Sequence, residues 1–452
     1  MTPRQEQIVK NVEKYRQDIL DAERWIWAHP EVGYTEWQTN AYMVEKFKGY
    51  GYSPVEAGDI PGFYVDLDTR RPGPALAIMG ELDALDIANH PESVNGMTHC
   101  CGHNCQCAEM IGIAAALTEP GAMDGMCGKI RLLLVPAEEM IQLEYRKGLI
   151  DKGIIKYLGG KTEFMRRGFF DGVDLALMVH QDNENEYDFT CQEGFNGIIA
   201  KILTYKGKSS HAGGSPHDGI NAQYAATLGL DGCNALRETF RDQDHIRFHP
   251  ILKGVRSAVN IIPDEMRIES YTRGKTMDAY VKANKRINRA LAAGALAIGA
   301  QLHVCDLPGY ATEIHDRTFM DLCQKCCEDL SGREKVKFDH NAWSTGSSDF
   351  GDLTMVMPGV QFYACGCAGL GHGIDFCVED PERACVNPAK AELFIADALL
   401  SDGAAKAKEI IANYQPQFGS IREYLDFIDT LATDKDVIQY TEKGTFIDLP
   451  ND

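Results

Sequence analysis

The stretch from Gly96 to Ala108 reads GMTHCCGHNCQCA and gathers three potential metal ligands, His99, Cys101 and His103, into one tight turn. Cys101 and His103 stand on either side of a glycine, so both side chains can point at one cation. Cys sulfur and His nitrogen are the donors that zinc and related ions prefer. A buried thiol beside a hydrogen-bonded imidazole would explain the pair equally well, so the interpretation depends on further ligands elsewhere in the chain.

Outward from this stretch, three short apolar runs predict buried strands, and each is followed by potential ligands. The runs are residues 75–79, before Glu81, Asp83 and Asp86; residues 129–135, before Glu138 and Glu139; and residues 175–179, before His180. Open α/β sheets place their ligand sites beyond the carboxyl ends of the strands. The pattern therefore predicts an α/β domain with metal ligands gathered at one edge of its sheet.

A second unit is expected from about Phe195, where longer strands of alternating character begin. It is predicted to contain strands over 197–207, 258–262, 266–271 and 301–306 and helices over 221–236 and 277–298. This set is typical of a compact α+β unit. We therefore expect a catalytic domain in two parts, residues 1–194 and 308–452, with residues 195–307 inserted between them as a separate domain.

The composition is that of a folded protein without a nucleic-acid or membrane partner. The chain of 452 residues is too long for one core of ordinary size, which favours two domains. A formal net charge of -21 argues against nucleic acid, because phosphate binding needs Lys and Arg patches. No apolar run is long enough to span a bilayer and the first residues are polar, so we expect a cytoplasmic protein with its 15 cysteines reduced.

Several motifs along the chain resemble those of one family, the cytosolic metal-dependent amidohydrolases that include aminoacylases, auxin-conjugate hydrolases, hippurate hydrolases and aminobenzoyl-glutamate hydrolases. The resemblance covers nearly the whole chain in order. The family motifs and the positions similar to them here are His-Pro-Glu-x-Gly-(Phe/Tyr)-x-Glu at 29–36, Asp-x-Asp-Ala-Leu-Pro at 81–86, Met-His-Ala-Cys-Gly-His-Asp at 98–104, Pro-Ala-Glu-Glu at 136–139, a strand-end His at 180, Gly-x-x-x-His-Ala at 207–212, Asn-x-Ile-Pro at 260–263, Gly-Ser-x-Asp-Phe at 346–350 and an isolated His at 372. The resemblance implies a phosphorylase/hydrolase-like α/β catalytic domain with a mixed sheet, and an inserted ferredoxin-like α+β domain for dimerisation or as a lid.

The resemblance also implies which side chains carry the chemistry. Glu138 would be the general base, and Asp83 would orient a ligand. From the inserted domain, His211 would lean into the site to stabilise the oxyanion, often the site of the partner subunit, while Asn260 and Arg273 would hold the substrate. Two divalent ions, zinc or manganese, would be held by five ligands: Cys101, His103, Glu139, His180 and His372.

Physical reasoning agrees with two of these roles. Adjacent glutamates after a strand face different ways, so Glu139 can bind metal while Glu138 reaches the attacking water. The planar fork of Arg273 suits a free carboxylate, although an arginine on a strand is often a surface residue. Five neighbours of the site depart from the family pattern, and these changes leave the substrate less determined: Met79, Glu81, Asp86, Asn104 and Ser348.

We therefore expect a homodimeric two-metal amidohydrolase that acts on a small-molecule amide. The expected substrates are N-acyl or N-aroyl amino acids, such as an aminobenzoyl-glutamate-like compound, or small dipeptides. One alternative is a catalytically inactive metal-binding homologue that serves as a binding or scaffold subunit. Another is a redox or cluster protein built on spare cysteines, such as Cys323, Cys326 and Cys327 or the pair Cys365 and Cys367.

Overall fold

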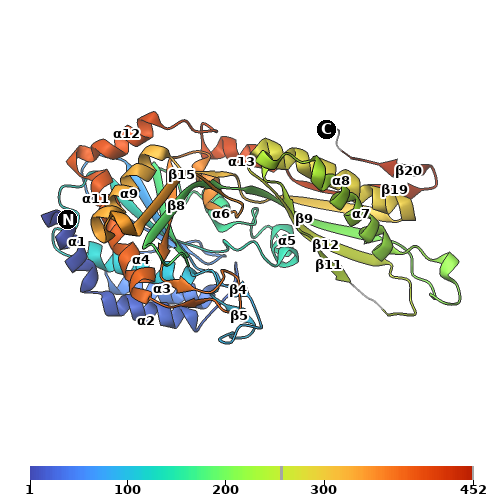
Figure 1. Cartoon of the computed structure of the whole chain (residues 1–452), viewed down its shortest axis with the longest axis horizontal. Helices are drawn as coiled ribbons and strands as arrows, with labels where there is room; N and C mark the ends of the chain where they lie inside the picture. The colour runs from blue at the N-terminus through green and yellow to red at the C-terminus, as the bar shows by residue number, and fades with distance from the viewer. Residues whose placement is uncertain (255–257, 450–452) are drawn as a thin grey trace.

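The computed structural model describes residues 1–254 and 258–449, which form two lobes along one long axis (Figure 1). The first lobe is built on a nine-stranded mixed sheet with the order β1-β2-β6-β3-β7-β16-β8-β14, to which β15 adds by pairing with β8. Strands β6, β3, β7 and β16 run parallel, so their carboxyl ends lie at the same edge. The strands are β1 (Val55–Glu56), β2 (Phe63–Asp68), β3 (Ala75–Glu81), β6 (Lys129–Val135), β7 (Leu175–Asp182), β8 (Phe189–Phe195), β14 (Glu313–Ile314), β15 (Val336–Ser344) and β16 (Gly359–Cys365).

Helices cover both faces of this sheet, and its central strands are buried on both sides. Along β3, Ile78 packs into one hydrophobic core and Met79 into another, and Leu132 and Leu133 of β6 divide in the same way. The first core contains residues of α1 (Pro3–Glu13), α2 (Arg16–Trp27), α3 (Trp37–Gly49), α4 (His103–Leu117), α9 (Arg317–Ser331), α11 (Asn387–Leu400) and α12 (Ala405–Asn413), and the second contains residues of α6 (Gly160–Arg166), α10 (Phe350–Thr354) and α13 (Ile421–Asp429). The predicted α/β lobe with a mixed sheet is confirmed.

The second lobe is an antiparallel sheet with two helices packed on one face. Its order is β10-β12-β9-β13-β19-β20, with β11 also pairing with β12. A separate hydrophobic core joins this sheet to both helices. The elements are β9 (Gly197–Lys206), α7 (Ala222–Leu236), β10 (Arg247–Phe248), β11 (Ile251–Gly254), β12 (Glu265–Gly274), α8 (Met277–Ile298), β13 (Gln301–Pro308), β19 (Thr433–Thr441) and β20 (Gly444–Ile447).

Two features of this lobe differ from the expectations above. Residues 258–262 form no strand, and there Ile261 makes only an isolated bridge with His211. Strands β19 and β20 come from the end of the chain, which the sequence-based boundaries placed with the first lobe, yet β19 pairs with β13. An uncovered β13 would leave a row of unpaired backbone groups at the sheet edge, and β19 satisfies them.

Helix α5 (Leu143–Asp151) lies between the two lobes (Figure 1). The segment that contains α5, residues 140–158, contributes Met140, Leu143 and Leu158 to a small hydrophobic cluster. The second sheet contributes Ile198 and Leu307 to the same cluster. Ion pairs from Glu144 to Arg267, 2.7 Å, and from Lys147 to Asp434, 3.0 Å, add to the contact. The segment therefore fixes how the lobes face each other.

Two small strand pairs complete the first lobe, β4 (Leu85–Asp86) with β5 (Met97–Thr98) and β17 (Cys367–Ala368) with β18 (Cys377–Val378). None of the helices in the described part of the chain has the length and apolar character needed to cross a bilayer.

Candidate metal centre and active site

The turn before α4 directs Cys101 and His103 to the same side. Gly102 between them has φ 87°, a left-handed conformation that glycine adopts without strain. A Cβ at this position would lie 2.7 Å from the Cβ of Gln181. Because Gln181 follows His180 on β7, the glycine allows the turn to approach the strand that carries the third candidate ligand.

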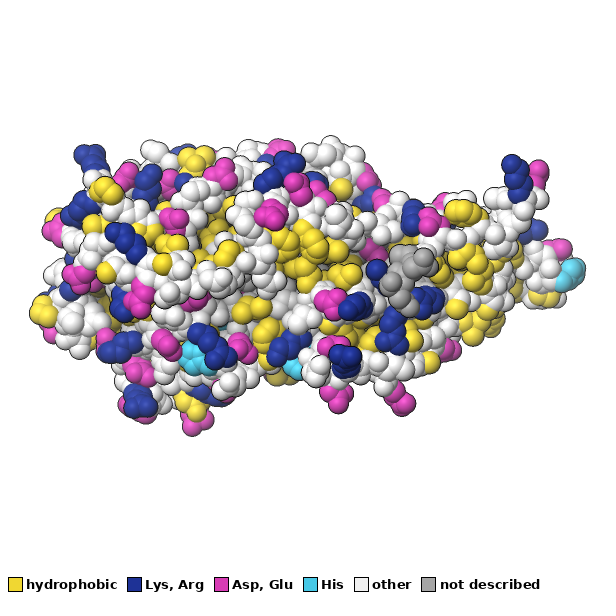
Figure 2. Space-filling model, turned by 90° about the horizontal axis from the view of Figure 1, so that it is seen from above, with side chains coloured by type: hydrophobic (Ala, Val, Ile, Leu, Met, Phe, Trp, Pro, Cys, Tyr) yellow, Lys and Arg dark blue, Asp and Glu magenta, His cyan; other side chains and the backbone are white. Residues whose placement is uncertain are grey.

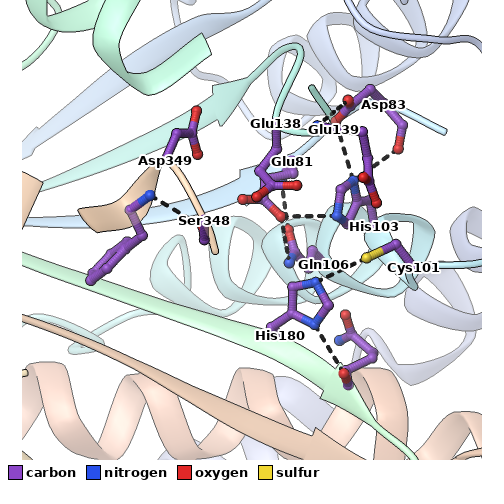
Figure 3. Close-up of polar contacts among 12 residues, drawn as sticks. Glu81, Asp83, Cys101, His103, Gln106, Glu138, Glu139, His180, Ser348 and Asp349 are labelled. Carbon is purple, nitrogen blue, oxygen red and sulfur yellow. Dashed lines mark hydrogen bonds and ion pairs between the residues drawn. The ribbon is translucent and has the colours of Figure 1, made fainter. Parts of the chain in front are cut away.

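The five candidate ligands lie in two groups that share one sulfur atom. Cys101, His103 and His180 form one group, and Cys101, Glu139 and His372 form the other, with all donor atoms of a group within 4.8 Å of one another. Within them, Cys101 Sγ lies 3.3 Å from His180 Nε2, and Glu139 Oε1 lies 3.0 Å from His372 Nε2. Figure 3 shows four of these side chains converging from the ends of β6 and β7 and the start of α4.

Hydrogen bonds orient the candidate ligands from behind. His103 Nδ1 lies 2.9 Å from the carbonyl of Asp83 and 3.2 Å from its carboxylate, and His180 Nδ1 lies 2.9 Å from the carbonyl of Gln181. The second carboxylate oxygen of Asp83 accepts a hydrogen bond of 2.8 Å from the Glu139 N–H. Asp83 thus touches a ligand of each group, and both imidazoles turn Nε2 towards the centre, as metal-binding histidines do.

A metal ion fits the atoms that remain. His103 Nε2 and Glu139 Oε1 are buried, and neither has a partner in hydrogen-bonding geometry, although each faces a side chain about 3 Å away. Burial raises the pKa of Glu139, but His372 and His103 outweigh it and lower the pKa to about 2. Burial and Glu139 raise the pKa of Cys101, yet His180 and His103 bring it to about 6. A carboxylate and a thiolate facing imidazoles are a donor set suited to zinc or manganese.

Glu138 lies beside these groups and is almost fully buried. Burial and the negative charges of Glu81 and Glu139 raise its pKa well above the usual range. Glu81, His103 and Glu138 form a third group of potential ligands. A carboxyl group that lines the cleft and whose pKa is raised by its surroundings can accept a proton and return it.

Glu81 was expected near the site from its place beyond a predicted strand, but the side chains that hold it, Lys161 and Gln106, were not. The Glu81 carboxylate accepts hydrogen bonds from Lys161 and, at 2.9 Å, from Gln106. Lys161 is fully buried and also bonds Asp349. The one available signal for Glu81 was its place just beyond a predicted strand; Lys161 had none, because its partners lie far away in the sequence.

A cleft of about 540 Å³, a volume within the range of ligand sites, lies between the lobes and is lined in part by the candidate metal ligands. The first lobe contributes four of the five candidate ligands together with Glu138, and the second lobe contributes His249, Tyr271 and Arg273. Aromatic side chains complete the wall: Phe195, Tyr310 and Tyr363. His249 had no signal in the sequence.

Arg273 is the cation of the cleft. Its Nη1 donates to Ser347 Oγ at 2.9 Å and its Nε to His249 Nε2 at 3.1 Å. Burial lowers its pKa, and within residues 1–254 and 258–449 no carboxylate forms an ion pair with it. A half-buried guanidinium without an acidic partner can bind an anionic group of a ligand.

The chain does not bring His211 and Asn260 to its own cleft. Both are exposed on the second lobe, where the carbonyl of Asn260 accepts a hydrogen bond of 3.0 Å from the N–H of Ala212. His211 Nδ1 accepts hydrogen bonds from the N–H groups of Gly213 and Gly214, 3.1 and 2.9 Å. The two residues therefore lie in one exposed loop region, separate from the metal ligands.

Among the described residues, the cysteines other than Cys101 form no group that could hold a metal ion or a cluster. Of the cysteines, only Cys101 belongs to a group of three potential ligands. Cys323, Cys326 and Cys327 are buried in the first core on α9 and are free thiols. The described part of the chain thus gives no support to a cluster at these positions.

Comparison with known proteins agrees with this geometry. A model of the peptidase family M20/M25/M40 matches residues 77–391. The mouse Xaa-Arg dipeptidase is 27% identical over 371 residues, which cover 77% of this chain and 77% of that protein. Two solved structures share the fold: a dinuclear metal-binding peptidase from Bacillus subtilis, with TM-score 0.63, 20% identity and coverage of 86% and 99%, and an aminobenzoyl-glutamate utilization protein from Klebsiella pneumoniae, with TM-score 0.65, 18% identity and coverage of 85% and 97%.

Proposed function

This chain belongs to the peptidase family M20/M25/M40 and is a metal-dependent hydrolase of amide or peptide bonds, and we propose that it uses two divalent ions to cleave N-acyl or N-aroyl amino acids or small dipeptides. The observation that carries the proposal is the pair of ligand groups that share Cys101 beside the buried Glu138. Cys101, His103 and His180 would hold one ion, and Cys101, Glu139 and His372 the other. Ions bound there, zinc or manganese, would polarise the scissile carbonyl and make water a better nucleophile.

Glu138 would act as the general base and then as the acid. Its position at the cleft allows it to take a proton from the attacking water and to deliver it to the leaving nitrogen. The raised pKa suits both halves of this transfer, because the carboxyl group can hold the proton between them. Asp83 would keep His103 and Glu139 in place during the reaction.

The released amino acid would be recognised through its free carboxylate. Arg273 places a half-buried guanidinium in the cleft wall, and Ser347 beside it offers a hydroxyl. Phe195 and Tyr363, with ring centroids 6.0 Å apart, would contact an acyl or aroyl group. A planar aroyl group on an acidic amino acid, as in aminobenzoyl-glutamate, combines both features.

A second copy of the chain would complete the substrate site. The exposed edge strand β11 carries two exposed apolar residues, Ile251 and Leu252, which a symmetric partner strand would cover. Tyr224 and Leu228 of α7 are also exposed, and Figure 2 shows hydrophobic side chains gathered on this lobe. In such a homodimer His211 and Asn260 would reach the cleft of the partner subunit.

We propose that this enzyme acts in the cytoplasm.

The test is release of free amino acid from a panel of N-acyl and N-aroyl amino acids and dipeptides. The enzyme is stripped with a chelator and refilled separately with zinc and with manganese. We expect turnover to return with metal and to be fastest on substrates with a free carboxylate. Absence of turnover on the whole panel, with two ions bound per chain, would instead favour the binding or scaffold subunit.

A further inference from the structure

Helix α5 carries a buried arginine that the proposed reaction does not use. The side chain of Arg146 is 1% exposed, although burying a guanidinium is costly unless its N–H groups find acceptors. Within residues 1–254 and 258–449 it forms no ion pair with a carboxylate, and its N–H groups donate to backbone carbonyls. These are Leu158 at 2.7 Å, Ala137 at 3.2 Å and Glu139.

Two of these carbonyls flank Glu138. The loop begins with Ala137, whose φ of 58° lies in the left-handed region that is unfavourable for a residue with a Cβ. Such a conformation persists only where the surroundings impose it. Here the Ala137 N–H donates to Glu36 Oε1 at 2.8 Å while its carbonyl accepts from Arg146.

The rest of the loop is held in the same way, by side chains from distant parts of the chain. The Glu139 N–H donates to Asp83, and the Glu138 carbonyl accepts a hydrogen bond from the Tyr310 hydroxyl. The Met140 carbonyl accepts one from the hydroxyl of Tyr271. Tyr271 stands on β12, two residues before Arg273, so the strand that presents the substrate cation also holds the catalytic loop.

Gly33 leaves the space that the guanidinium needs. A Cβ at this position would lie 2.3 Å from Arg146 Nη2 and 2.9 Å from the Cα of Ala137. No atom of a larger side chain fits there without displacing both groups. The chain is therefore shaped to admit Arg146 against the loop.

We propose that Arg146 is a positioning residue whose guanidinium, with the hydroxyls of Tyr271 and Tyr310, sets the backbone of residues 137–140 so that Glu138 faces the cleft and Glu139 the ligand group. Tyr271 joins this loop to the second lobe. The kinetic consequences rest on the proposed function. The structural consequence, a loop held rigid by side chains, does not.

The variants that test this are Arg146→Lys, which can bond only part of the carbonyl set, and Tyr271→Phe, which removes one hydroxyl. With metal-loaded full-length enzyme, we expect kcat to fall more than thirtyfold in the first and three- to tenfold in the second, with KM changed less than threefold. The matched control is Arg71→Lys, because Arg71 also donates to two backbone carbonyls, Met123 and Met126, but lies on the surface away from the cleft. It should leave kcat unchanged.

A second readout is independent of turnover. Hydrogen–deuterium exchange of the amides of residues 137–140 should be at least tenfold faster in Arg146→Lys than in the parent or in Arg71→Lys, with exchange in the preceding strand β6 unchanged. Parent-like kcat and parent-like exchange in folded Arg146→Lys would overturn the proposal. If the parent enzyme turns over no substrate, exchange alone decides it, and if Arg146→Lys does not fold, Tyr271→Phe is measured by the same two criteria.

Discussion

The two lobes contribute to the cleft in opposite ways. Four of the five candidate ligands of the first lobe come from strand ends and the start of α4; His103 and Glu139 are buried, Cys101 and His180 half-buried, and His372 exposed. Hydrogen bonds to Asp83 and to the carbonyl of Gln181 orient His103, Glu139 and His180. In the second lobe, His211 and Asn260 are exposed, and within the described ranges 1–254 and 258–449 their hydrogen bonds go to neighbours in their own loop region. One chain thus supplies all the candidate metal ligands, whereas His211 and Asn260 would contribute to a cleft only in a partner subunit.

Arg273 is the exception that joins the lobes. It belongs to the second sheet but is held by Ser347 of the first lobe. We infer that anchoring of the substrate depends on how the lobes face each other, and that the segment containing α5 sets this arrangement. The predictions below test this division of roles.

The largest effect is expected for Glu138→Gln. The amide keeps the size of the side chain but cannot take a proton, and general acid–base groups supply about a hundredfold to ten-thousandfold of rate. We expect kcat to fall about a thousandfold while two ions remain bound, measured by amino-acid release and by elemental analysis. Glu409→Gln, a change on the exposed face of α12, is the matched control. Normal turnover by the Glu138 variant would assign the proton transfer to another group.

The second prediction concerns the contribution of a partner subunit. If His211 acts across the dimer, His211→Ala alone should be almost inactive. Mixing it with an equal amount of the Glu138→Gln variant and allowing the subunits to exchange should restore about a quarter of parental activity. Half of the dimers then contain one chain of each variant, and one of the two sites in each mixed dimer is intact. Action within the chain's own cleft would give no recovery on mixing.

The first lobe could be predicted from the sequence because its signals are local. A run of apolar residues marked β6, and the glutamates at its end followed directly. In the second lobe, the helical periodicity of α8 was equally clear. Strand β19 gave no such signal, since its exposure pattern is irregular and its place depends on the free edge of β13. Local sequence pattern is enough to predict β6 and α8, whereas β19 forms because of a partner strand far away in the sequence.

The same distinction separates the parts of the site. Cys101, His103 and Glu139 were indicated by residue type and spacing, and the structure brings them together. Arg146 and Lys161 were not, because their roles arise from contacts with Glu139 and with Glu81 across folded segments. Residue type alone does not distinguish such buried cations from surface ones.

The third prediction tests the cation between the lobes. Arg273→Met removes the guanidinium but keeps an apolar side chain of moderate length. Hydrogen bonds to charged groups contribute about 1.5–3 kcal/mol, so we expect KM for substrates with a free carboxylate to rise about tenfold to a hundredfold. For the same substrates with the carboxylate converted to an amide, the KM of Arg273→Met should be close to that of the parent. An equal rise for both would show that Arg273 does not bind the carboxylate.

The last prediction concerns the protons of the ligand groups. Glu139 raises the pKa of His372 to about 11, and Glu81 and Cys101 raise the pKa of His103 despite its burial. His372 is therefore protonated at pH 7 before metal binds, and the pKa of His103 is shifted in the same direction, whereas Glu139 and most of Cys101 are already ionised. Ligation needs neutral imidazole, so metal binding must displace protons, and the apparent affinity should rise with pH between 6 and 8, about tenfold per unit for each proton released.

Calorimetric titration in buffers of different ionisation enthalpy measures this release. Proton release in the His211→Ala variant should equal that of the parent, because His211 lies outside the ligand groups. A smaller release in that variant would place His211 in electrostatic contact with the metal centre within the same chain. The two lobes would then not divide the chemistry between them as their burial indicates, and recovery of activity on mixing would have to arise in some other way.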